Sequence, residues 1–311
     1  MSSIARPAAG TARRVAASPS GRRARHGWAG LAFLAPFLCV FVLTILAPVV
    51  YAIVLSLFRQ RLIGGNAFVG FENYLTAFSD PKFLEGLLRV CGFLVVQVPI
   101  MLALALLAAM ALDSRRLAGA GFYRITLFLP YAVPGVVAVL MWGFLYSERL
   151  GLAGNINDFL GLELITPFTA QWILFAIGNI VTWEFVGYNM LVFYAALRTI
   201  PEELYEAAAI DGAGPWRLVT SIKIPALRGA IVIATIFSII GTFQLFNEPN
   251  ILRTSAPGLI PTYYTPNMYA YNLSFIGQQA NYAATLAIIM GIVTAVIAYI
   301  VQVRGTRQEI R

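Results

Sequence analysis

The sequence has few charged residues, and that shortage sets its class. Of the 311 residues only 12% are Asp, Glu, Lys or Arg, while 59% are hydrophobic. Soluble globular domains are about a quarter charged and about half apolar. A chain of this composition has too few polar side chains to cover a water-facing surface. The composition therefore predicts a protein that crosses a membrane several times.

Histidine and cysteine are also scarce, which excludes several kinds of chemistry. The single histidine, His26, lies in a basic N-terminal tail, and both cysteines, Cys39 and Cys91, lie inside apolar stretches. We predict that these cysteines pack among apolar groups and form neither a disulfide nor a metal site. No Ser–His–Asp set and no GxxxxGK[ST] phosphate loop occurs in the sequence. We therefore expect no catalytic residue and no metal ligand, and any ATP that drives the protein must bind another polypeptide.

The N-terminal tail is the most basic part of the chain. Residues 1–28 hold six arginines among Ala, Ser, Pro and Gly, and such a segment cannot bury a core, so we predict that it is disordered. Its charge is typical of an orientation signal or of weak contact with anionic lipid. The net charge of +8 does not indicate nucleic acid, because most other basic residues flank apolar segments.

Six apolar segments are long enough to cross a bilayer, which takes about 20 helical residues. Pro130 and Pro134 predict kinks in the third segment. We place the transmembrane domain at 29–305 and a short tail at 306–311. The predicted spans are about 31–58, 90–112, 122–146, 172–197, 230–246 and 282–303.

The distribution of positive charge predicts the orientation. Six spans place both termini on one side of the membrane, and 16 of the 22 Lys and Arg residues fall on that side. The excess of positive charge on cytoplasmic segments therefore puts both termini and the loop after the fourth span in the cytoplasm. Asp113, Arg115 and Arg116 are interpreted as ordinary charges beside a short cytoplasmic loop.

The loop after the fourth span is the longest polar passage between two apolar segments. Residues 200–225 read IPEELYEAAAIDGAGPWRLVTSIKIP. Pro201 is suited to the first turn of a helix, and Gly212 and Gly214 are suited to ending it. Pro215 can begin a second short helix, and we expect Pro225 to end it. The passage predicts two short helices joined by a glycine turn at the membrane surface.

Two apolar spans carry polar groups. Glu184 lies inside the fourth span, in TWEFVGYNM, where an acid costs about 2.5–3.5 kcal/mol on insertion scales. It either binds sugar hydroxyls together with Trp183 and Tyr188, or clamps two helices by a hydrogen bond; the sequence favours neither. In the fifth span, Ser238, Thr242 and, less regularly, Gln244 form a polar stripe.

The passage 200–225 resembles the EAA loop of permease subunits of binding-protein-dependent ABC importers. That loop reads EAA, three residues, G, nine residues, I, one residue, LP, and only Ile224, which stands for Leu, departs from it. DGA at 211–213 and GFENY at 70–74 are similar to segments of the sugar-importing branch. The resemblance implies that an ATPase is coupled through Glu206, Ala207, Ala208, Asp211, Gly212, Ile222 and Pro225.

The resemblance to maltose-type carbohydrate importers also implies a fold, a location and partners. The fold would be the all-α, six-helix type I ABC importer permease fold with a cytoplasmic coupling-helix loop, in a bacterial cell membrane. The partners would be a second, related permease, two copies of a cytoplasmic ATPase and an extracellular solute-binding protein. ATP and magnesium would bind the ATPase, and this chain would need no cofactor.

The expected substrate is a neutral sugar, and by analogy a di- or oligosaccharide. Together, the residues themselves and the resemblance predict a substrate site formed by Trp183, Glu184, Tyr188, Ser238, Gly241, Thr242 and Gln244.

Two other functions remain open at this stage. The same kind of machine can import another solute such as glycerol 3-phosphate, but a phosphate favours basic residues in the pathway. The interiors of the fourth and fifth spans hold no Lys or Arg. A stand-alone secondary transporter can use Glu184 as a proton carrier, but that mechanism gives the EAA-like loop no purpose.

Overall fold

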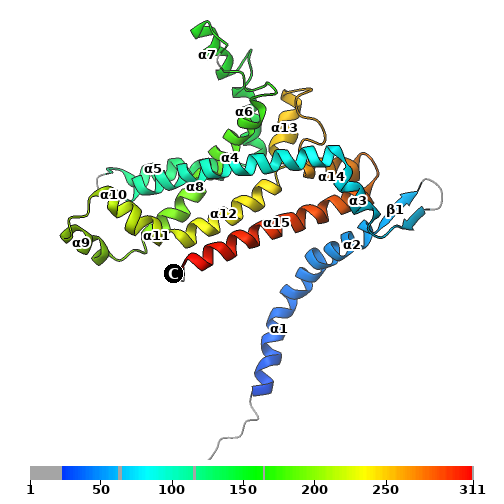
Figure 1. The fold of residues 1–311 in the computed structure, drawn as a ribbon, viewed down its shortest axis with the longest axis horizontal. Coiled ribbons are helices and arrows are strands. Elements are labelled where there is room, and N and C mark those ends of the chain that lie inside the picture. Colours follow the sequence, from blue (N-terminus) through cyan, green and yellow to red (C-terminus); the bar gives the residue numbers. More distant parts are fainter. Residues whose placement is uncertain (1–22, 62–64, 115–116, 164, 310–311) are drawn as a thin grey trace, which may run out of the picture. The chain divides into compact units, whose positions relative to one another are not determined.

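The computed structural model describes residues 23–61, 65–114, 117–163 and 165–309, and most of them are helical (Figure 1). The chain divides into two compact units, residues 1–51 and 52–311. In the first unit, α1 (Arg23–Phe41), the π-helical turn η2 (Val42–Leu46) and the start of α2 (Ala47–Ser56) form one helical run. Residues 1–22 of the predicted disordered tail lie outside the described residues. For 23–28 the prediction is wrong, because α1 begins at Arg23 and meets no proline before Pro36.

The second unit opens with a small hairpin where the sequence predicts only a loop. Strands β1 (Phe58–Arg61) and β2 (Gly65–Phe68) pair antiparallel, with Phe58 opposite Phe68. The helix α3 (Glu72–Ser79) follows and carries the buried Asn73. The Asn73 amide donates to the backbone oxygens of Ser56 and Phe58, at 2.8 and 2.9 Å. Asn73, from the GFENY segment, thus fixes the chain where α2 ends and the hairpin begins.

Helix α4 (Pro81–Leu112) is an unbroken run of 32 residues. The Asp80 side chain caps it by accepting a hydrogen bond from the Lys82 amide at 3.0 Å. The same carboxylate accepts hydrogen bonds from the hydroxyls of Tyr269 and Tyr282, each at 2.9 Å. Asp80 therefore joins the start of α4 to α14 (Pro266–Phe275) and α15 (Ala280–Glu309).

The third predicted span is not one kinked helix. It consists of α5 (Ala120–Phe128) with the 3-10 turn η3 (Leu129–Ala132), and then α6 (Gly135–Leu145), bent by 98° at the break. Val133 is extended there, with φ −77° and ψ 130°. A residue that precedes proline is pushed out of the helical region, so Pro134 breaks the segment where a kink was expected. The short helix α7 (Leu152–Leu160) follows.

The fourth span and the loop after it agree with the sequence prediction, except at Pro225. Helix α8 (Ile173–Leu197) is followed by α9 (Glu202–Ile210), a turn at Gly212 with φ +71°, and α10 (Pro215–Leu218). The chain does not end its helix at Pro225. It continues through the π-helical turn η4 (Val219–Lys223) and α11 (Ile224–Ala226), and bends by 62° before α12 (Arg228–Phe243). Helix α13 (Asn247–Ser255) follows.

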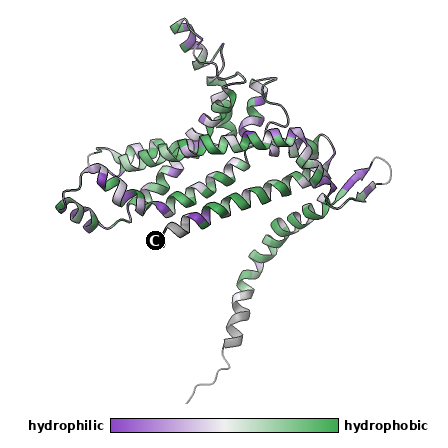
Figure 2. Cartoon of the chain, in the orientation of Figure 1, coloured by the Kyte–Doolittle hydropathy of each residue, from purple (hydrophilic) through white to green (hydrophobic). Residues whose placement is uncertain are grey.

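The long helices α4, α8, α12 and α15 form the body of the second unit. Helix α4 packs against α8 and α12, and α12 packs against α15 (Figure 1). Their surfaces are apolar along most of their length (Figure 2). Within the described residues, four helices are long and apolar enough to span a membrane, or six if each bent pair counts as one. The expectation of a helical, multi-pass membrane protein is confirmed.

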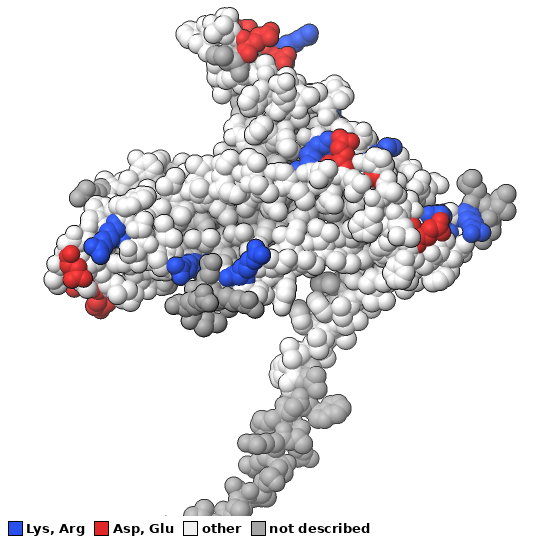
Figure 3. Space-filling model, in the orientation of Figure 1, with Lys and Arg blue, Asp and Glu red and all other residues white. Residues whose placement is uncertain are grey.

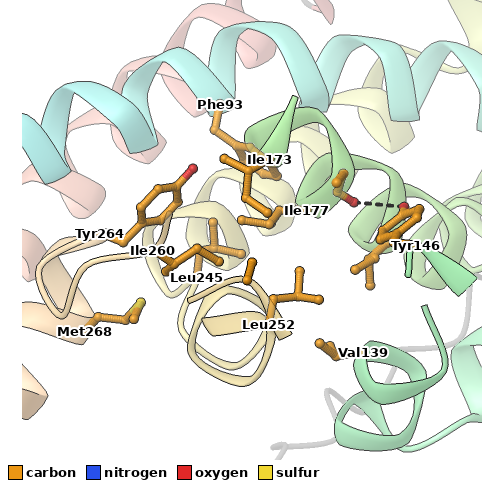
Figure 4. Close-up of a cluster of buried hydrophobic side chains, with 13 residues drawn as sticks. Phe93, Val139, Tyr146, Ile173, Ile177, Leu245, Leu252, Ile260, Tyr264 and Met268 are labelled. Atoms are coloured by element: carbon orange, nitrogen blue, oxygen red, sulfur yellow. Dashed lines mark hydrogen bonds between the residues drawn. The ribbon is translucent and has the colours of Figure 1, made fainter. Parts of the chain in front are cut away.

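The two ends of this helical body differ. The elements α9 to α11 lie at one end, and α3, β1 and α14 lie at the other (Figure 1). Charged side chains gather toward these ends and at α7 (Figure 3). One buried apolar cluster joins α8, α6, α13 and the loop after α13, with Leu252 and Ile177 at its centre (Figure 4). Within it, the Tyr146 hydroxyl donates to the Ala176 carbonyl oxygen at 3.2 Å (Figure 4).

Helices α5 and α8 approach each other closely at Gly187. A Cβ at this position would overlap the carbonyl oxygen of Leu127 and crowd Phe128 Cα, both of which are backbone atoms. No side-chain rotation can relieve such an overlap, so only glycine allows the two helices to meet here.

We expect Gly187→Ala to destabilise the protein by about 1–3 kcal/mol, because overpacked cores lose free energy of that order. The measurement is thermal unfolding of the purified protein in detergent. Gly92→Ala is the matched control, because no atom lies within 4 Å of a Cβ there. Equal unfolding temperatures for the two variants would contradict the close approach.

Candidate functional site

A cavity of about 480 Å³ lies between α4, α8 and α12. The turn η3 and the start of α13 close two of its sides. Its volume falls within the roughly 300–1,000 Å³ that is usual for small-molecule sites. The cavity is therefore large enough for a small polar ligand.

One wall of the cavity is aromatic. Tyr131 from η3 stacks on Tyr188 from α8, with ring centroids 5.0 Å apart and ring planes at 24°. Tyr131 also meets Phe185 edge to face, at 5.8 Å. Aromatic rings held in this way offer flat apolar faces with a hydroxyl at the edge.

Other parts of the lining are polar. Ser238, Thr242 and Gln244 come from α12 and its end, and Gln97 and Asn189 come from α4 and α8. The Gln97 amide nitrogen donates to the Thr182 hydroxyl at 3.2 Å. Its buried oxygen has no hydrogen-bond partner in the described part of the chain. An unsatisfied buried acceptor costs about 1–3 kcal/mol, so the wall of the cavity carries a polar group that the described chain leaves unpaired.

An acid, Glu248, completes the lining from the first turn of α13. Burial raises the pKa of its carboxyl, and its own backbone amide partly opposes that rise. No Lys or Arg occurs among the described residues that line the cavity. The cavity therefore offers hydrogen-bond donors and acceptors and one carboxyl group, but no positive charge for an anion.

The structure brings together five of the seven residues predicted to contact substrate. Tyr188, Ser238, Gly241, Thr242 and Gln244 line the cavity, and Trp183 and Glu184 do not. Successive residues of a helix are about 100° apart. The lining positions of α8 (181, 185, 188 and 189) fill one arc, with Glu184 at its edge and Trp183 on the opposite side. Trp183 instead meets the Trp142 ring of α6 edge to face, at 5.8 Å.

Glu184 lies at the start of α6 instead of in the cavity. A Cβ on Gly135, the first residue of α6, would be 3.1 Å from Glu184 Oε1. The positive end of a helix dipole stabilises a carboxylate placed there. The side chain is buried, and its Oε2 has no hydrogen-bond partner among the described residues. Both interpretations of Glu184, as a sugar ligand and as a hydrogen-bond clamp between helices, stay predictions.

The loop between α8 and α12 forms a second region of interest. Among the residues expected to couple to an ATPase, Glu206, Ala207, Asp211 and Gly212 are exposed, and Ala208, Ile222 and Pro225 are half-buried. Two large apolar side chains on the same loop, Ile210 and Trp216, are 87% and 79% exposed. Exposed apolar groups that cluster on a protruding loop are typical of a surface that another protein covers.

An ion pair that the sequence did not reveal holds this loop to α4. Lys223 Nζ lies 2.6 Å from Asp113 Oδ2, and the two side chains are only 14% and 9% exposed. Lys223 Nζ also lies 5.7 Å from the ring centroid of Tyr205 in α9. Burial, and then the nearby Asp113 carboxylate, raise the pKa of the Tyr205 hydroxyl. The sequence gives no sign of this pair, because its partners are 110 positions apart.

Comparison with known proteins gives consistent matches over most of the chain. A family model described as "Binding-protein-dependent transport system inner membrane component" matches residues 74–307. The chain is 33% identical over 285 residues to the lactose transport system permease protein LacF of Rhizobium radiobacter, which covers 88% of this chain and 92% of that protein.

Two further matches extend this result. The diacetylchitobiose uptake system permease protein NgcF of Streptomyces coelicolor is 33% identical over 287 residues, covering 87% of this chain and 80% of its own. In a solved bacterial ABC transporter involved in the import of alginate, one chain superposes with a TM-score of 0.79 at 20% identity. That match covers 91% of this chain and 96% of the other.

We expect a cysteine placed at Ser238 to react with a water-soluble thiol reagent, because this position lines the cavity. A cysteine at Ile239, the next residue of α12, should react much more slowly, since Ile239 is 3% exposed and packs in the core. Both variants need Cys39 and Cys91 replaced by Ala. Equal labelling rates at the two positions would contradict the prediction that Ser238 faces the cavity and Ile239 faces the core.

Proposed function

The chain belongs to the family of binding-protein-dependent transport system inner membrane components, and we propose that it forms half of the translocation pathway for a neutral sugar in an ATP-driven importer. The predicted type I ABC importer permease fold is confirmed by this membership and by the superposition on a solved ABC transporter chain. The family is one of transport permeases, which agrees with the expectation that the chain is not an enzyme. The location of the protein in a membrane is likewise established.

The cavity between α4, α8 and α12 is the observation that carries the proposed substrate class. A sugar presents C–H faces that stack on aromatic rings and hydroxyls that need hydrogen-bond partners. The stacked Tyr131 and Tyr188 supply the first. Gln97, Ser238, Thr242, Gln244 and Glu248 supply the second. A phosphate would face Glu248 with no basic residue in the described lining to compensate, which argues against glycerol 3-phosphate.

The relatives support the same class of substrate. The two curated relatives described above are named for lactose and for diacetylchitobiose, and both are uncharged disaccharides. We therefore propose a neutral di- or oligosaccharide. The alginate importer acts on an acidic polysaccharide, but at 20% identity that likeness concerns the fold alone.

The loop at 200–225 would couple the pathway to ATP hydrolysis. In this proposal the loop lies in the cytoplasm, and its exposed Ile210 and Trp216 are covered by one of two ATPase subunits that bind ATP and magnesium. Closure of the ATPase pair moves α9 and α10. That movement passes along η4 and α11 into α12, whose residues line the cavity. A second permease completes the pathway, and an extracellular binding protein delivers the sugar.

We expect the complex, purified from its own membrane and placed in liposomes, to take up a neutral disaccharide such as lactose or diacetylchitobiose only when ATP is present. Glycerol 3-phosphate should not be taken up. A crosslinker on a cysteine at Ala207 should capture the ATPase, and one at Thr76, at the opposite end of the unit, should not. Uptake driven by a pH gradient without ATP would instead identify a stand-alone secondary transporter.

We expect Gly212→Val to abolish uptake while the protein still inserts into the membrane. Gly212 has φ +71°, where an L-residue costs about 1–2 kcal/mol and a β-branched one more. The measurement is sugar uptake divided by the amount of this protein inserted into the membrane. Gly214→Val is the matched control, because Gly214 has φ −71° and open space around its Cβ position. Normal uptake by Gly212→Val would show that the turn is not needed for coupling.

A further inference from the structure

We propose that the buried ion pair between Asp113 and Lys223 carries the movement of the coupling loop to α4, so that both are positioning residues for transport. Lys223 Nζ lies 2.6 Å from Asp113 Oδ2, with both side chains largely withdrawn from water. The inference rests on the proposed function, because without an ATPase there is no loop movement to transmit.

The cavity lies between α4, α8 and α12. Of these three helices, α4 is the one that the adjacent chain does not join to the loop. Helix α8 ends three residues before the predicted loop begins, and α12 starts three residues after it ends. Both are therefore moved through the chain itself. Helix α4 supplies Phe93, Gln97 and Met101 to the cavity, yet its last residue, Leu112, is far from the loop in sequence. If the three helices that line the cavity are to move together, a non-covalent contact must connect α4 to the loop.

The ion pair is placed to be that link. Asp113 immediately follows α4, and its backbone amide still donates to the Ala109 carbonyl oxygen at 3.0 Å. Lys223 is the last residue of the π-helical turn η4, and single π-helical turns within helices occur often at functional sites. The ring of Tyr205 lies beside the Lys223 ammonium, so α9 is joined to the same group. Lys223 thus connects α9 and η4 to the end of α4.

Helix α4 also makes apolar contacts at this end, which are less directional. Ala105, Ala109 and Leu112 pack in a buried cluster with residues of α8 and with Leu227. Apolar contacts are non-directional, so they permit small sliding movements between helices. A buried, charge-assisted hydrogen bond has a preferred distance and direction. The pair therefore fixes the position of the α4 end relative to the loop, and α4 is continuous from there to Gln97.

The test uses the complete transporter in liposomes and measures sugar molecules taken up per ATP hydrolysed. The key variant is the double replacement Asp113→Asn with Lys223→Met, which keeps the side-chain sizes similar and leaves no unpaired buried charge. We expect this ratio to fall about tenfold, within the range of coupling free energies between protein sites. Lys223→Arg keeps the charge and should keep most of the ratio.

Arg59→Met is the matched control. It breaks the Arg59–Glu72 ion pair, which has the similar length of 2.7 Å but side chains that are 41% and 55% exposed. Exposed pairs contribute little, and we expect an unchanged ratio.

Each outcome distinguishes the two proposals. A wild-type complex without ATP-dependent sugar uptake would overturn the proposed function itself. A wild-type complex that transports, together with a double variant of unchanged ratio, would overturn only the role of the ion pair. If the double variant fails to assemble, Lys223→Arg decides the question, because a tenfold loss of its ratio would overturn a role that depends on the charge of Lys223.

Discussion

The packing of α4 against α8 is the contact on which the rest of the second unit depends. Both helices are long and apolar, and lipid offers no hydrophobic drive for them to associate. What holds them together is close fit and a few buried polar groups. At Gly178 of α8, a Cβ would meet the Phe93 and Gln97 side chains at the ordinary contact distances of 3.4 and 3.5 Å, so the two helices fit closely here. The Gln97 amide then reaches Thr182. The cavity lies beside this contact between α4 and α8, so the packing of the two helices sets its shape.

Carboxylates fix both ends of α4, and they do so in different ways. Asp80 caps the first turn and accepts hydrogen bonds from two tyrosine hydroxyls, which ties α4 to α14 and α15. Asp113 follows the last turn and pairs with Lys223 of the loop. Neutral tyrosine hydroxyls from α14 and α15 hold the first end. A charged lysine from the protruding loop holds the second end. If α4 moves during transport, the Asp113 end is the one that receives the movement.

The sequence predicts those features that follow from local composition. Long apolar runs identify the helices, and Gly212 between two helix-forming segments identifies the turn with positive φ. The sequence cannot distinguish a proline that kinks a helix from one that breaks it, so the bend at Pro134 was missed. Nor can it give the rotation of α8 about its axis, because neighbouring helices set that rotation. Trp183 and Glu184 were therefore assigned to the cavity, whereas Gln97 and the Asp113–Lys223 pair were overlooked. Each of these depends on contacts between distant segments.

Glu248 shows how the cavity can hold an acid without relying on its charge. It lies in α13, just after the spanning helix α12, and burial raises the pKa of its carboxyl. A raised pKa means that the carboxyl keeps its proton to a higher pH than a solvated glutamate does. In the protonated form it donates one hydrogen bond and accepts others, and in the ionised form it only accepts. Sugar hydroxyls donate and accept, so they can pair with either form. A phosphate can accept one hydrogen bond from the first form but is repelled by the second, and neither form supplies a positive charge. The discrimination between sugar and anion would then hold on both sides of the titration of this one group.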